Sequence, residues 1–185
     1  MKTEKEKMLE GELYNAADKQ LTGERQRARR LIKEYNNIPE DQVEERAALL
    51  KKLIPHSGAE LEIQPPFYCD YGSNIVLGDN VFFNFNCVIL DVTRVTIGNR
   101  CLFGPAVQIY TATHPMDHEQ RANGLEFGKS VNLGDDVWVG GNVTICPGVT
   151  IGDRAVIGAG SVVTKNIPPH VFAAGNPCRV IRKLE

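Results

Sequence analysis

Between residues 133 and 163 an aliphatic residue recurs at every sixth position. The members of this aliphatic ladder are Leu133, Val139, Ile145, Ile151, Ile157 and Val163. Glycine directly follows four of them, at Gly134, Gly140, Gly152 and Gly158. A six-residue period matches neither an α-helix nor the alternation of a half-buried strand. It predicts a coil with three flat faces, in which each aliphatic residue points inward and stacks about 4.8 Å above its equivalent in the coil below.

The same spacing extends, less regularly, toward the N-terminus. Two further runs keep the six-residue step: Leu77, Phe83 and Ile89, then Ile97, Phe103 and Ile109. The step between Ile89 and Ile97 is two residues longer, which predicts an enlarged corner at residues 91–94. Residues 59–185 are therefore expected to form about five coils of a parallel β-helix, with a tail from about residue 166, and the protein is expected to be mainly β.

Residues 1–58 lack the sixfold period and carry helical patterns. Two sets of residues each share one helical face: Ala28, Leu31, Ile32 and Tyr35, then Val43, Ala47, Leu50 and Ile54. Proline-containing segments at 36–39 and 55–58 interrupt the pattern. We expect two or three short helices that form an N-terminal cap over the first end of the coil and protect its exposed strand edge.

A basic cluster falls within the first helical pattern, at Arg25, Arg27, Arg29, Arg30 and Lys33. It can form a patch for an anion or a nucleic acid, or a solvated helix face balanced by Glu24 and Glu34, and the second interpretation is favoured. The net charge of the chain is −2, which gives no general attraction to nucleic acid or to a membrane surface.

The composition favours a cytoplasmic protein. The N-terminus, MKTEKEKMLEGELY, is charged and lacks the apolar stretch of a secretory signal. No apolar run approaches the roughly 20 residues that span a bilayer. The five cysteines include no C-x-x-C pair, so reduced thiols in the cytosol are expected at Cys69, Cys87, Cys101, Cys146 and Cys178.

The sixfold period disappears at residues 111–130, TATHPMDHEQRANGLEFGKS, and resumes at Leu133. A segment that interrupts a repeat must project from it, and projecting loops on rigid scaffolds often carry function. His114 lies at the base of this loop, where a neutral imidazole can remove a proton from a hydroxyl. A structural histidine in a tight turn is the equally weighted alternative. For His118, His56 and His170, surface or packing roles are expected.

Polar side chains also lie on the earlier coils. Asn84 and Asn86 are expected to project from a coil face, where an amide can donate a hydrogen bond to an oxyanion or simply bond a corner carbonyl. Asp70 and Asp91 are carboxylates of the kind that hold sugar hydroxyls, although turns favour aspartate as well.

Small and basic residues lie late in the chain. Glycine and alanine can open a groove along the coil, and basic side chains at its end can hold phosphates or can be ordinary surface charge. The residues concerned are Gly141, Ala159, Gly160, Thr164, Lys165, Arg179 and Arg182.

A zinc site is the main alternative chemistry for such a coil, because the γ-carbonic anhydrases share the sixfold repeat and need three converging imidazoles. His114 and His118 can supply two, but the other histidines lie at opposite ends of the coil, and the chain has no H-E-x-x-H or Cys/His pattern. We therefore expect no metal.

Taken together, these residues resemble the hexapeptide-repeat acyltransferases, and within them the maltose/galactoside O-acetyltransferase family. The resemblance covers almost the whole chain. It rests on Leu13-Tyr14 with Asp18, Cys69-Asp70-Tyr71-Gly72, Asn84-Phe85-Asn86, Leu90-Asp91-Val92, Thr113-His114-Pro115, Asn142 to Gly148, Gly158 to Lys165, and Gly175 to Arg182.

The resemblance implies a homotrimer of left-handed β-helices, with acetyl-CoA along the coil and a sugar under the projecting loop, each active site being shared by two subunits. By the same resemblance His114 is the general base and Asn84 the oxyanion donor. The acceptor-site candidates are Asp18, Asp70, Asn84 and Asp91. The acetyl-CoA contacts are Gly141, Ala159, Thr164, Lys165, Arg179 and Arg182.

Two positions favour the maltose-type branch, which acetylates glucose and maltose, usually at the 6-hydroxyl. Galactoside-type members carry serine where Asp70 stands and a second carboxylate where Val92 stands. Galactoside-type and nodulation-type acceptors stay open, as do a zinc hydratase and a non-catalytic trimeric scaffold on the same fold.

Overall fold

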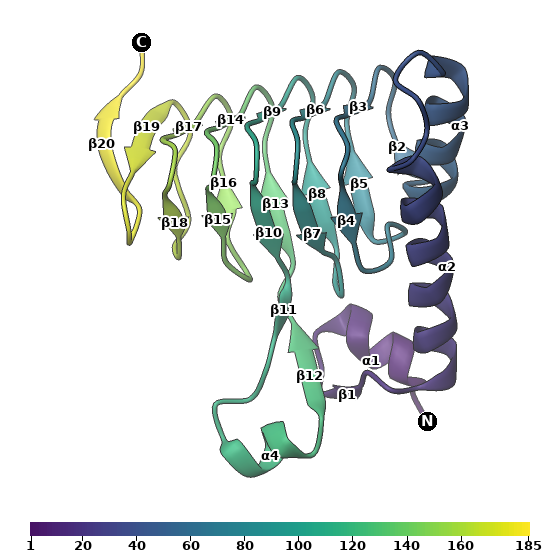
Figure 1. The fold of residues 1–185 in the computed structure, drawn as a ribbon. Coiled ribbons are helices and arrows are strands. Elements are labelled where there is room, and N and C mark those ends of the chain that lie inside the picture. The colour runs from purple at the N-terminus through teal and green to yellow at the C-terminus, as the bar shows by residue number, and fades with distance from the viewer.

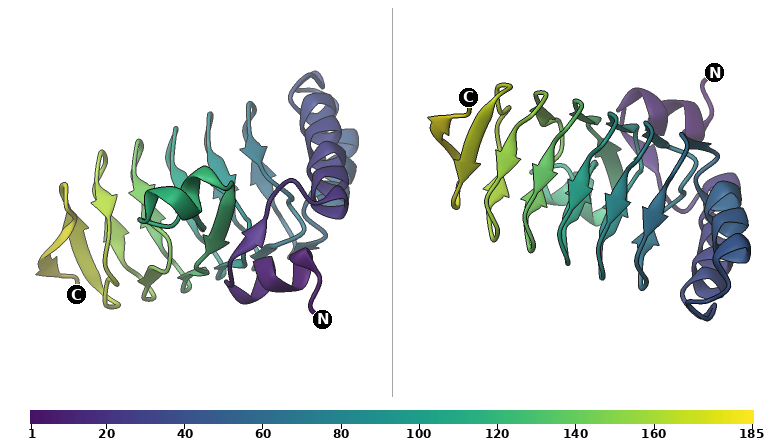
Figure 2. Two further views of the ribbon diagram at one scale, coloured as in Figure 1. Left: turned by 90° about the horizontal axis from the view of Figure 1, so that it is seen from below. Right: turned by 90° about the horizontal axis from the view of Figure 1, so that it is seen from above.

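A computed structural model describes residues 1–185 and shows a three-sided coil that carries an α-helical cap at one end (Figures 1 and 2). The strands of each face form one sheet along the coil. The first sheet contains β2 (His56–Ser57), β5 (Ile75–Leu77), β8 (Val95–Ile97), β13 (Val131–Leu133) and β16 (Thr150–Ile151). The second contains β3 (Glu62–Ile63), β6 (Phe82–Phe83), β9 (Leu102–Phe103), β14 (Trp138–Val139), β17 (Val156–Ile157), β19 (Val171–Ala174) and β20 (Arg179–Lys183). The third contains β4 (Tyr68–Cys69), β7 (Val88–Leu90), β10 (Gln108–Tyr110), β15 (Thr144–Ile145) and β18 (Val162–Val163).

From β2 to β19 all neighbouring strands of the coil are parallel, so the predicted mainly β, parallel β-helix is confirmed. The coil has six levels rather than about five, because residues 56–69 already form one. Ser57, Ile63 and Cys69 stack under Leu77, Phe83 and Ile89 at the sixfold spacing. Ser57 and Cys69 stand at positions where the later levels have aliphatic residues, so the sixfold aliphatic pattern does not reveal this first level. At the other end, β19 extends the coil to Ala174, beyond the expected start of the tail, and β20 pairs with it antiparallel.

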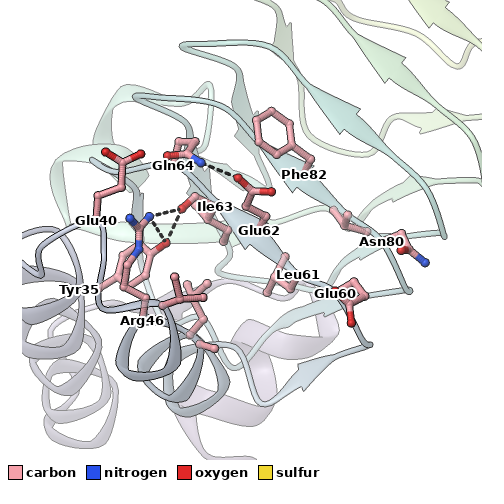
Figure 3. A pocket seen from close by; sticks show the side chains of 14 residues that line it. Tyr35, Glu40, Arg46, Glu60, Leu61, Glu62, Ile63, Gln64, Asn80 and Phe82 are labelled. Atoms are coloured by element: carbon pink, nitrogen blue, oxygen red, sulfur yellow. Dashed lines mark hydrogen bonds between the residues drawn. The ribbon is translucent and has the colours of Figure 1, made fainter.

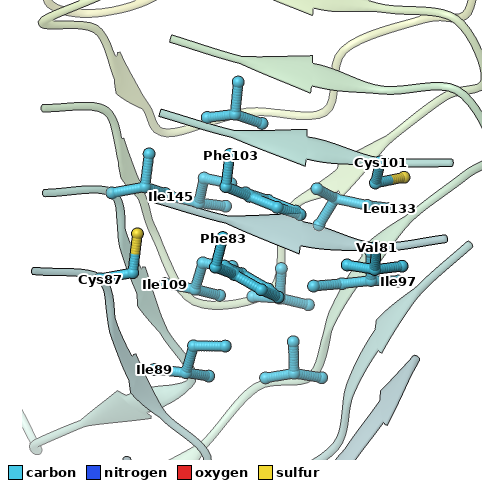
Figure 4. Packing of buried hydrophobic residues seen from close by; sticks show 14 of the residues in the cluster. Val81, Phe83, Cys87, Ile89, Ile97, Cys101, Phe103, Ile109, Leu133 and Ile145 are labelled. Atoms are coloured by element: carbon cyan, nitrogen blue, oxygen red, sulfur yellow. The ribbon is translucent and has the colours of Figure 1, made fainter. Parts of the chain in front are cut away.

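The aliphatic ladder forms the centre of the core (Figure 4). Each member lies directly above its equivalent, as in the register of Ile89, Ile109, Ile145 and Val163 through the third sheet. In the second sheet the rings of Phe83 and Phe103 stack with centroids 4.3 Å apart. Fully burying one such side chain stabilises the folded state by about 1.5–3 kcal/mol, and each level of the coil adds further contributions of this size.

A second ladder, of hydrogen bonds, runs up the corner between the first and second sheets. Asn99 Oδ1 accepts from the backbone N–H of Asp79, Asp135 Oδ1 from that of Asn99, and Asp153 Oδ1 from that of Asp135, at 2.7–2.9 Å. Glycine precedes each of these corner residues, and at Gly78, Gly98 and Gly134 the carboxylate or amide of the next level occupies the space of a Cβ. At Gly134 a Cβ would lie 1.9 Å from Asp153 Oδ1.

The N-terminal cap consists of α1 (Glu4–Glu10), α2 (Lys19–Tyr35) and α3 (Val43–Leu53). Ala28, Ile32 and Tyr35 of α2 are buried as predicted. The edge strand β3 is covered because the carbonyl of Ile63 accepts hydrogen bonds from Tyr35 Oη and, at 3.2 Å, from Arg46.

The predicted apolar face of α3 is wrong in part. Leu49, Leu50 and Leu53 are buried against the core, whereas Val43 is 69% exposed. Val43 and Ala47 instead line an open cavity of about 620 Å³ between α3 and β3 (Figure 3).

The projecting loop contains β11 (Ala112–Thr113), α4 (His118–Ala122) and β12 (Leu125–Gly128). β12 pairs antiparallel with β11 and, on its other side, with β1 (Tyr14–Asn15) of the N-terminal segment. The loop is thus a small three-stranded sheet anchored to both the coil and the cap (Figure 1). None of the four helices combines the length and the apolar character that crossing a bilayer requires.

Replacing Gly134 by alanine should lower the free energy of unfolding by about 1–3 kcal/mol, because the new Cβ displaces the Asp153 carboxylate and breaks the corner ladder. Gly23→Ala is the matched control. Gly23 lies in α2 with nothing within 4 Å of a Cβ, so alanine should stabilise by up to about 1 kcal/mol. Urea unfolding measures both, and equal effects of the two substitutions would contradict this account of the corner.

Candidate functional site

His114 lies at the foot of the projecting loop, directly after β11, and its side chain is exposed. Its Nδ1 is 3.4 Å from the backbone carbonyl oxygen of Leu125, which follows α4 on the return path of the loop. A carbonyl oxygen can only accept, so this contact favours the tautomer with hydrogen on Nδ1. Nε2 then carries the free lone pair that a general base needs.

The foot of the loop is held by a buried threonine. Thr111 Oγ1 donates to the carbonyl of Leu90 at 2.7 Å and accepts from the N–H of Thr93 at 3.0 Å. The carbonyl of Thr111 accepts from the N–H of Lys129, which closes the loop. These bonds attach the loop to the rigid coil, so the position of His114 is set by the core and not by the loop alone.

Two carboxylates lie near each other on the cap side of His114. Glu126, in β12, accepts a hydrogen bond from Tyr14 Oη at 2.8 Å. Asp70, which follows β4, is close enough to Glu126 for the two charges to interact, and burial followed by this repulsion raises the pKa of Asp70. Arg25 opposes the shift. Asp70 therefore lies within the range of charge interaction with Glu126 of the projecting loop.

Glu126 and Arg25 were not predicted as site residues. Arg25 donates to Tyr71 Oη at 2.7 Å and to the carbonyl of Ala16 at 2.6 Å, which ties α2 to the segment that carries Asp70. Glu126 lies in an aperiodic loop, and no local pattern could have shown that it lies near Asp70 and Tyr14. Only the pairing of β12 with β1 brings these residues together.

Asp91 does not face a site, which corrects its assignment as an acceptor-site candidate. Its side chain is 0% exposed, and Oδ1 accepts from the backbone N–H groups of Asp70 and Tyr71 at 3.0 and 2.9 Å. Burial raises the pKa of Asp91 to about 7 in spite of these hydrogen bonds. Asp91 fills the enlarged corner after β7 and positions the Asp70 turn.

Asp18 serves as the N-cap of α2. Its Oδ1 accepts from the N–H groups of Gln20 and Leu21 at 2.9 and 3.2 Å. A capping carboxylate of this kind contributes about 1 kcal/mol to helix stability. Its second oxygen makes no hydrogen bond within the chain, so Asp18 caps α2 with one carboxylate oxygen and keeps the other free.

Asn84 lies at the corner that leads from β6 to the third sheet. Its Oδ1 accepts from the N–H of Phe85 at 2.7 Å, which leaves the Nδ2 group without an acceptor in the chain and free to donate outward. Gly141 follows β14 and Ala159 follows β17, so they lie above Asn84 on the same corner.

The other predicted residues lie elsewhere on the coil. Thr164 and Lys165 directly follow β18 of the third sheet. They therefore lie on the same corner of the coil as the foot of the projecting loop, which follows β10. Arg179 and Arg182 lie in β20, and the Arg182 guanidinium is 6.0 Å from the ring centre of Phe172.

The third sheet therefore separates Asn84 from His114. One face of the coil uses about six residues at about 3.3 Å each, so its two corners are about 20 Å apart. A single chain cannot bring an amide on one corner and an imidazole on the other to the same atom.

The histidine side chains that could bind a metal also lie far apart. His118 begins α4, while His56 and His170 lie at opposite ends of the coil. No three histidine, cysteine, aspartate or glutamate side chains form a group that could hold a metal ion. All five cysteines are free thiols, and burial raises the pKa of each, so none is an activated nucleophile.

Comparison with known proteins supplies the family. Residues 7–58 match the maltose acetyltransferase hexapeptide capping motif, and residues 130–165 match the bacterial transferase hexapeptide model of six repeats. Nodulation protein L of Rhizobium meliloti is 51% identical over 97% of this chain and 98% of its own length. The chain belongs to the maltose/galactoside family of hexapeptide-repeat acetyltransferases.

Two solved structures of acetyltransferases place the whole fold within this family. A maltose O-acetyltransferase from Clostridium difficile has a TM-score of 0.98 and 50% identity, with 100% of this chain and 98% of that chain covered. A galactoside acetyltransferase in complex with coenzyme A has a TM-score of 0.96 and 43% identity, with 100% and 92% covered.

Val92, one of the two positions on which the choice of acceptor type is expected to depend, is an apolar residue that follows Asp91. It is 4% exposed and packs in a small apolar cluster with Met8, Tyr14, Leu21 and Tyr71. Tyr71 of this cluster directly follows Asp70, and Tyr14 of the same cluster donates a hydrogen bond to Glu126, so both carboxylates border the cluster.

Replacing Asp91 by asparagine should remove a pH dependence of stability. The pKa of Asp91 is raised on folding, from 3.8 to about 7, so the folded state favours the protonated form. Stability from this group is present below pH about 4 and is lost as pH rises to about 7. Urea unfolding of both proteins between pH 4.5 and 7.5 should show wild type losing stability relative to Asp91→Asn. A constant difference across this range would contradict the raised pKa.

Proposed function

We propose that the protein transfers the acetyl group of acetyl-CoA to a hydroxyl of a sugar, with His114 as general base. The observation that carries this proposal is the exposed His114 imidazole whose Nδ1 faces the Leu125 carbonyl, in a chain that belongs to an acetyltransferase family. The coenzyme A bound in the related galactoside acetyltransferase supports the thioester as donor. The maltose/glucose type of acceptor, at the 6-hydroxyl, is proposed from Asp70 and Val92.

The chemistry is a direct transfer. Nε2 of His114 removes the hydroxyl proton as the sugar oxygen attacks the thioester carbonyl carbon. The negative charge on the former carbonyl oxygen is held by the Asn84 Nδ2–H group, a kind of donor worth about 3 kcal/mol. The C–S bond then breaks, and the imidazolium returns its proton to the sulfur of CoA. Proximity in the ternary complex supplies much of the acceleration.

The site requires a second subunit. His114 and Asn84 lie on different corners of one chain, about 20 Å apart. A closed ring of identical subunits places one surface against a different surface of its neighbour, so the loop of one chain can meet the Asn84 corner of the next. We therefore propose a homotrimer with three shared sites.

Acetyl-CoA would lie along the Asn84 corner, past Gly141 and Ala159, where small residues leave room for the pantetheine arm. Thr164 and Lys165 of the adjoining chain would complete this wall. Arg179 and Arg182 in β20 would hold phosphates at the C-terminal end of the coil. At the other end of the site, Asp70 and Glu126 would accept hydrogen bonds from sugar hydroxyls.

A galactoside or nodulation-type acceptor is the second candidate. The nodulation-type acceptor is favoured by the 51% identity to nodulation protein L, which equals the 50% identity to the maltose O-acetyltransferase within one per cent, whereas the identity to the galactoside acetyltransferase structure is 43%. The acceptor is therefore best identified by comparing turnover among sugars.

His114→Ala should reduce turnover by about 10²–10⁴-fold because the hydroxyl proton loses its acceptor. His118→Ala, in the same loop and equally exposed, should keep wild-type turnover. The measurement is release of free CoA with glucose, maltose, galactosides and amino sugars, and glucose or maltose should be preferred. Wild-type turnover in His114→Ala would remove His114 from the mechanism, and no turnover of any acceptor by wild type would favour a non-catalytic scaffold.

Mixing His114→Ala and Asn84→Ala subunits should restore activity that neither variant has alone. In mixed trimers one of the three sites receives an intact His114 from one subunit and an intact Asn84 from the next. Co-expression at equal amounts should give about a quarter of the wild-type turnover. Recovery no greater than the sum of the two separate variants would show that both residues act from one chain.

A further inference from the structure

A cavity of about 320 Å³ lies between α1, below the first levels of the coil in Figure 1, and the outer face of the first sheet. Leu9 of α1 lines one side, and His56 of β2 and Val76 of β5 line the other. The two corners that meet between neighbours in the proposed ring are the edges of the third sheet, so that sheet faces the ring axis. The outer face of the first sheet then turns away from the axis, and the contacts of the ring do not cover this cavity.

The register of the coil places three polar side chains in a column beside the cavity. Asn74, Arg94 and Ser130 directly precede β5, β8 and β13, whose first residues are partners in the sheet. The backbone N–H of the first residue of β8 donates to the carbonyl of Asn74 at 3.0 Å, and that of β13 donates to the carbonyl of Arg94 at 3.1 Å. Neighbouring levels are about 4.8 Å apart. Arg94 therefore lies one level from an amide on one side and one level from a hydroxyl on the other.

The basic side chains of the cavity have no partners within the chain. No carboxylate lies within 4.0 Å of Arg94 or His56, and neither side chain makes a hydrogen bond. The hydroxyls of Ser73 and Ser130 also line the cavity, and no aspartate or glutamate does. The cavity thus combines a guanidinium, an imidazole and two hydroxyls, a set that can donate hydrogen bonds to an anion.

The turn that carries Ser73 and Asn74 is fixed before any ligand binds. The backbone N–H of Asn74 donates to Asp91 Oδ2 at 3.4 Å, and its Nδ2 donates to the Asp91 carbonyl at 2.7 Å. Asp91 is fully buried and its Oδ1 accepts from other backbone N–H groups, so its carboxylate is not presented to the cavity. A site whose groups are already in position loses little entropy on binding.

We propose that this cavity binds a small phosphomonoester, with the phosphate at Arg94 and His56 and the carbon skeleton against Leu9 and Val76. A phosphate is favoured over a carboxylate because it offers three terminal oxygens to a planar guanidinium, an imidazole and two hydroxyls. A volume of about 320 Å³ is at the lower end of ligand sites, which fits a phosphate on a short carbon chain. None of these residues belongs to the proposed transfer site, so the proposal does not depend on the proposed function.

Calorimetric titration with glycerol 3-phosphate tests the site. Saturating CoA is present throughout, so that the phosphate positions proposed at the C-terminal end of the coil are filled. Wild type should bind one equivalent per chain and should not bind glycerol. Arg94→Gln should weaken binding by about tenfold or more, because charge-assisted hydrogen bonds are lost. Arg154→Gln is the matched control: it removes the same charge from an exposed side chain on another corner, beside Asp136, and should bind as wild type does.

A second variant tests the site without removing its cation. In Ser130→Glu the new carboxylate can reach Arg94 one level away and compete with the phosphate, so binding should be lost, whereas the neutral Ser130→Gln should bind. Both positions are exposed, and thermal unfolding should show unchanged stability. No binding of the ester to wild type overturns the proposal, and so does equal binding by wild type and Arg94→Gln. Inorganic phosphate is titrated in parallel, and an affinity equal to that of glycerol 3-phosphate overturns the assignment of an ester.

Discussion

The inward stacking of one aliphatic side chain above another, repeated along each face of the coil, is the interaction on which the rest of the structure depends. It requires consecutive levels to stay in register, as the pairing of Ile97, Leu133 and Ile151 shows. A parallel stack of this kind cannot slip by one residue without turning its core outward. The corners are consequently fixed in space, and a residue placed at a corner keeps its position at every level.

The projecting loop shows how this rigidity is passed to a segment with no core of its own. Residues 111–130 leave one corner and return to it, and Thr111 bonds Leu90 of β7 and Thr93 of the corner that follows β7 in the level below. The β12–β1 pairing then holds the loop against the N-terminal cap. A loop tied at both its foot and its side can present His114 in one orientation, which general base catalysis needs. The cap therefore covers the edge of the coil and also supports the loop.

The sequence predicted the features that recur and missed those that depend on contacts between distant segments. The aliphatic ladder and the projecting loop follow from a period and its interruption, so both could be read locally. Asp91 and Asp18 look like site residues in a sequence because a carboxylate after a strand or before a helix is typical of both roles. For Asp91, complete burial decides between these roles, and this burial is not visible without the fold. Glu126 could not be found because its partner, Tyr14, lies 112 residues away.

The division of the proposed catalytic groups between two corners has a consequence for evolution of the acceptor site. The Asn84 corner belongs to the regular coil, where Gly104 and Gly140 leave no space for a Cβ against the next level, so little can change there. The loop, the cap and α2 carry none of the sixfold constraint. Sequence changes that alter the acceptor are therefore expected to gather around Asp70, Glu126 and the α2 surface, while the donor wall stays constant. A rigid coil that holds the donor, joined to a cap and loop free of the sixfold constraint, would allow one acetyl donor to serve different sugars.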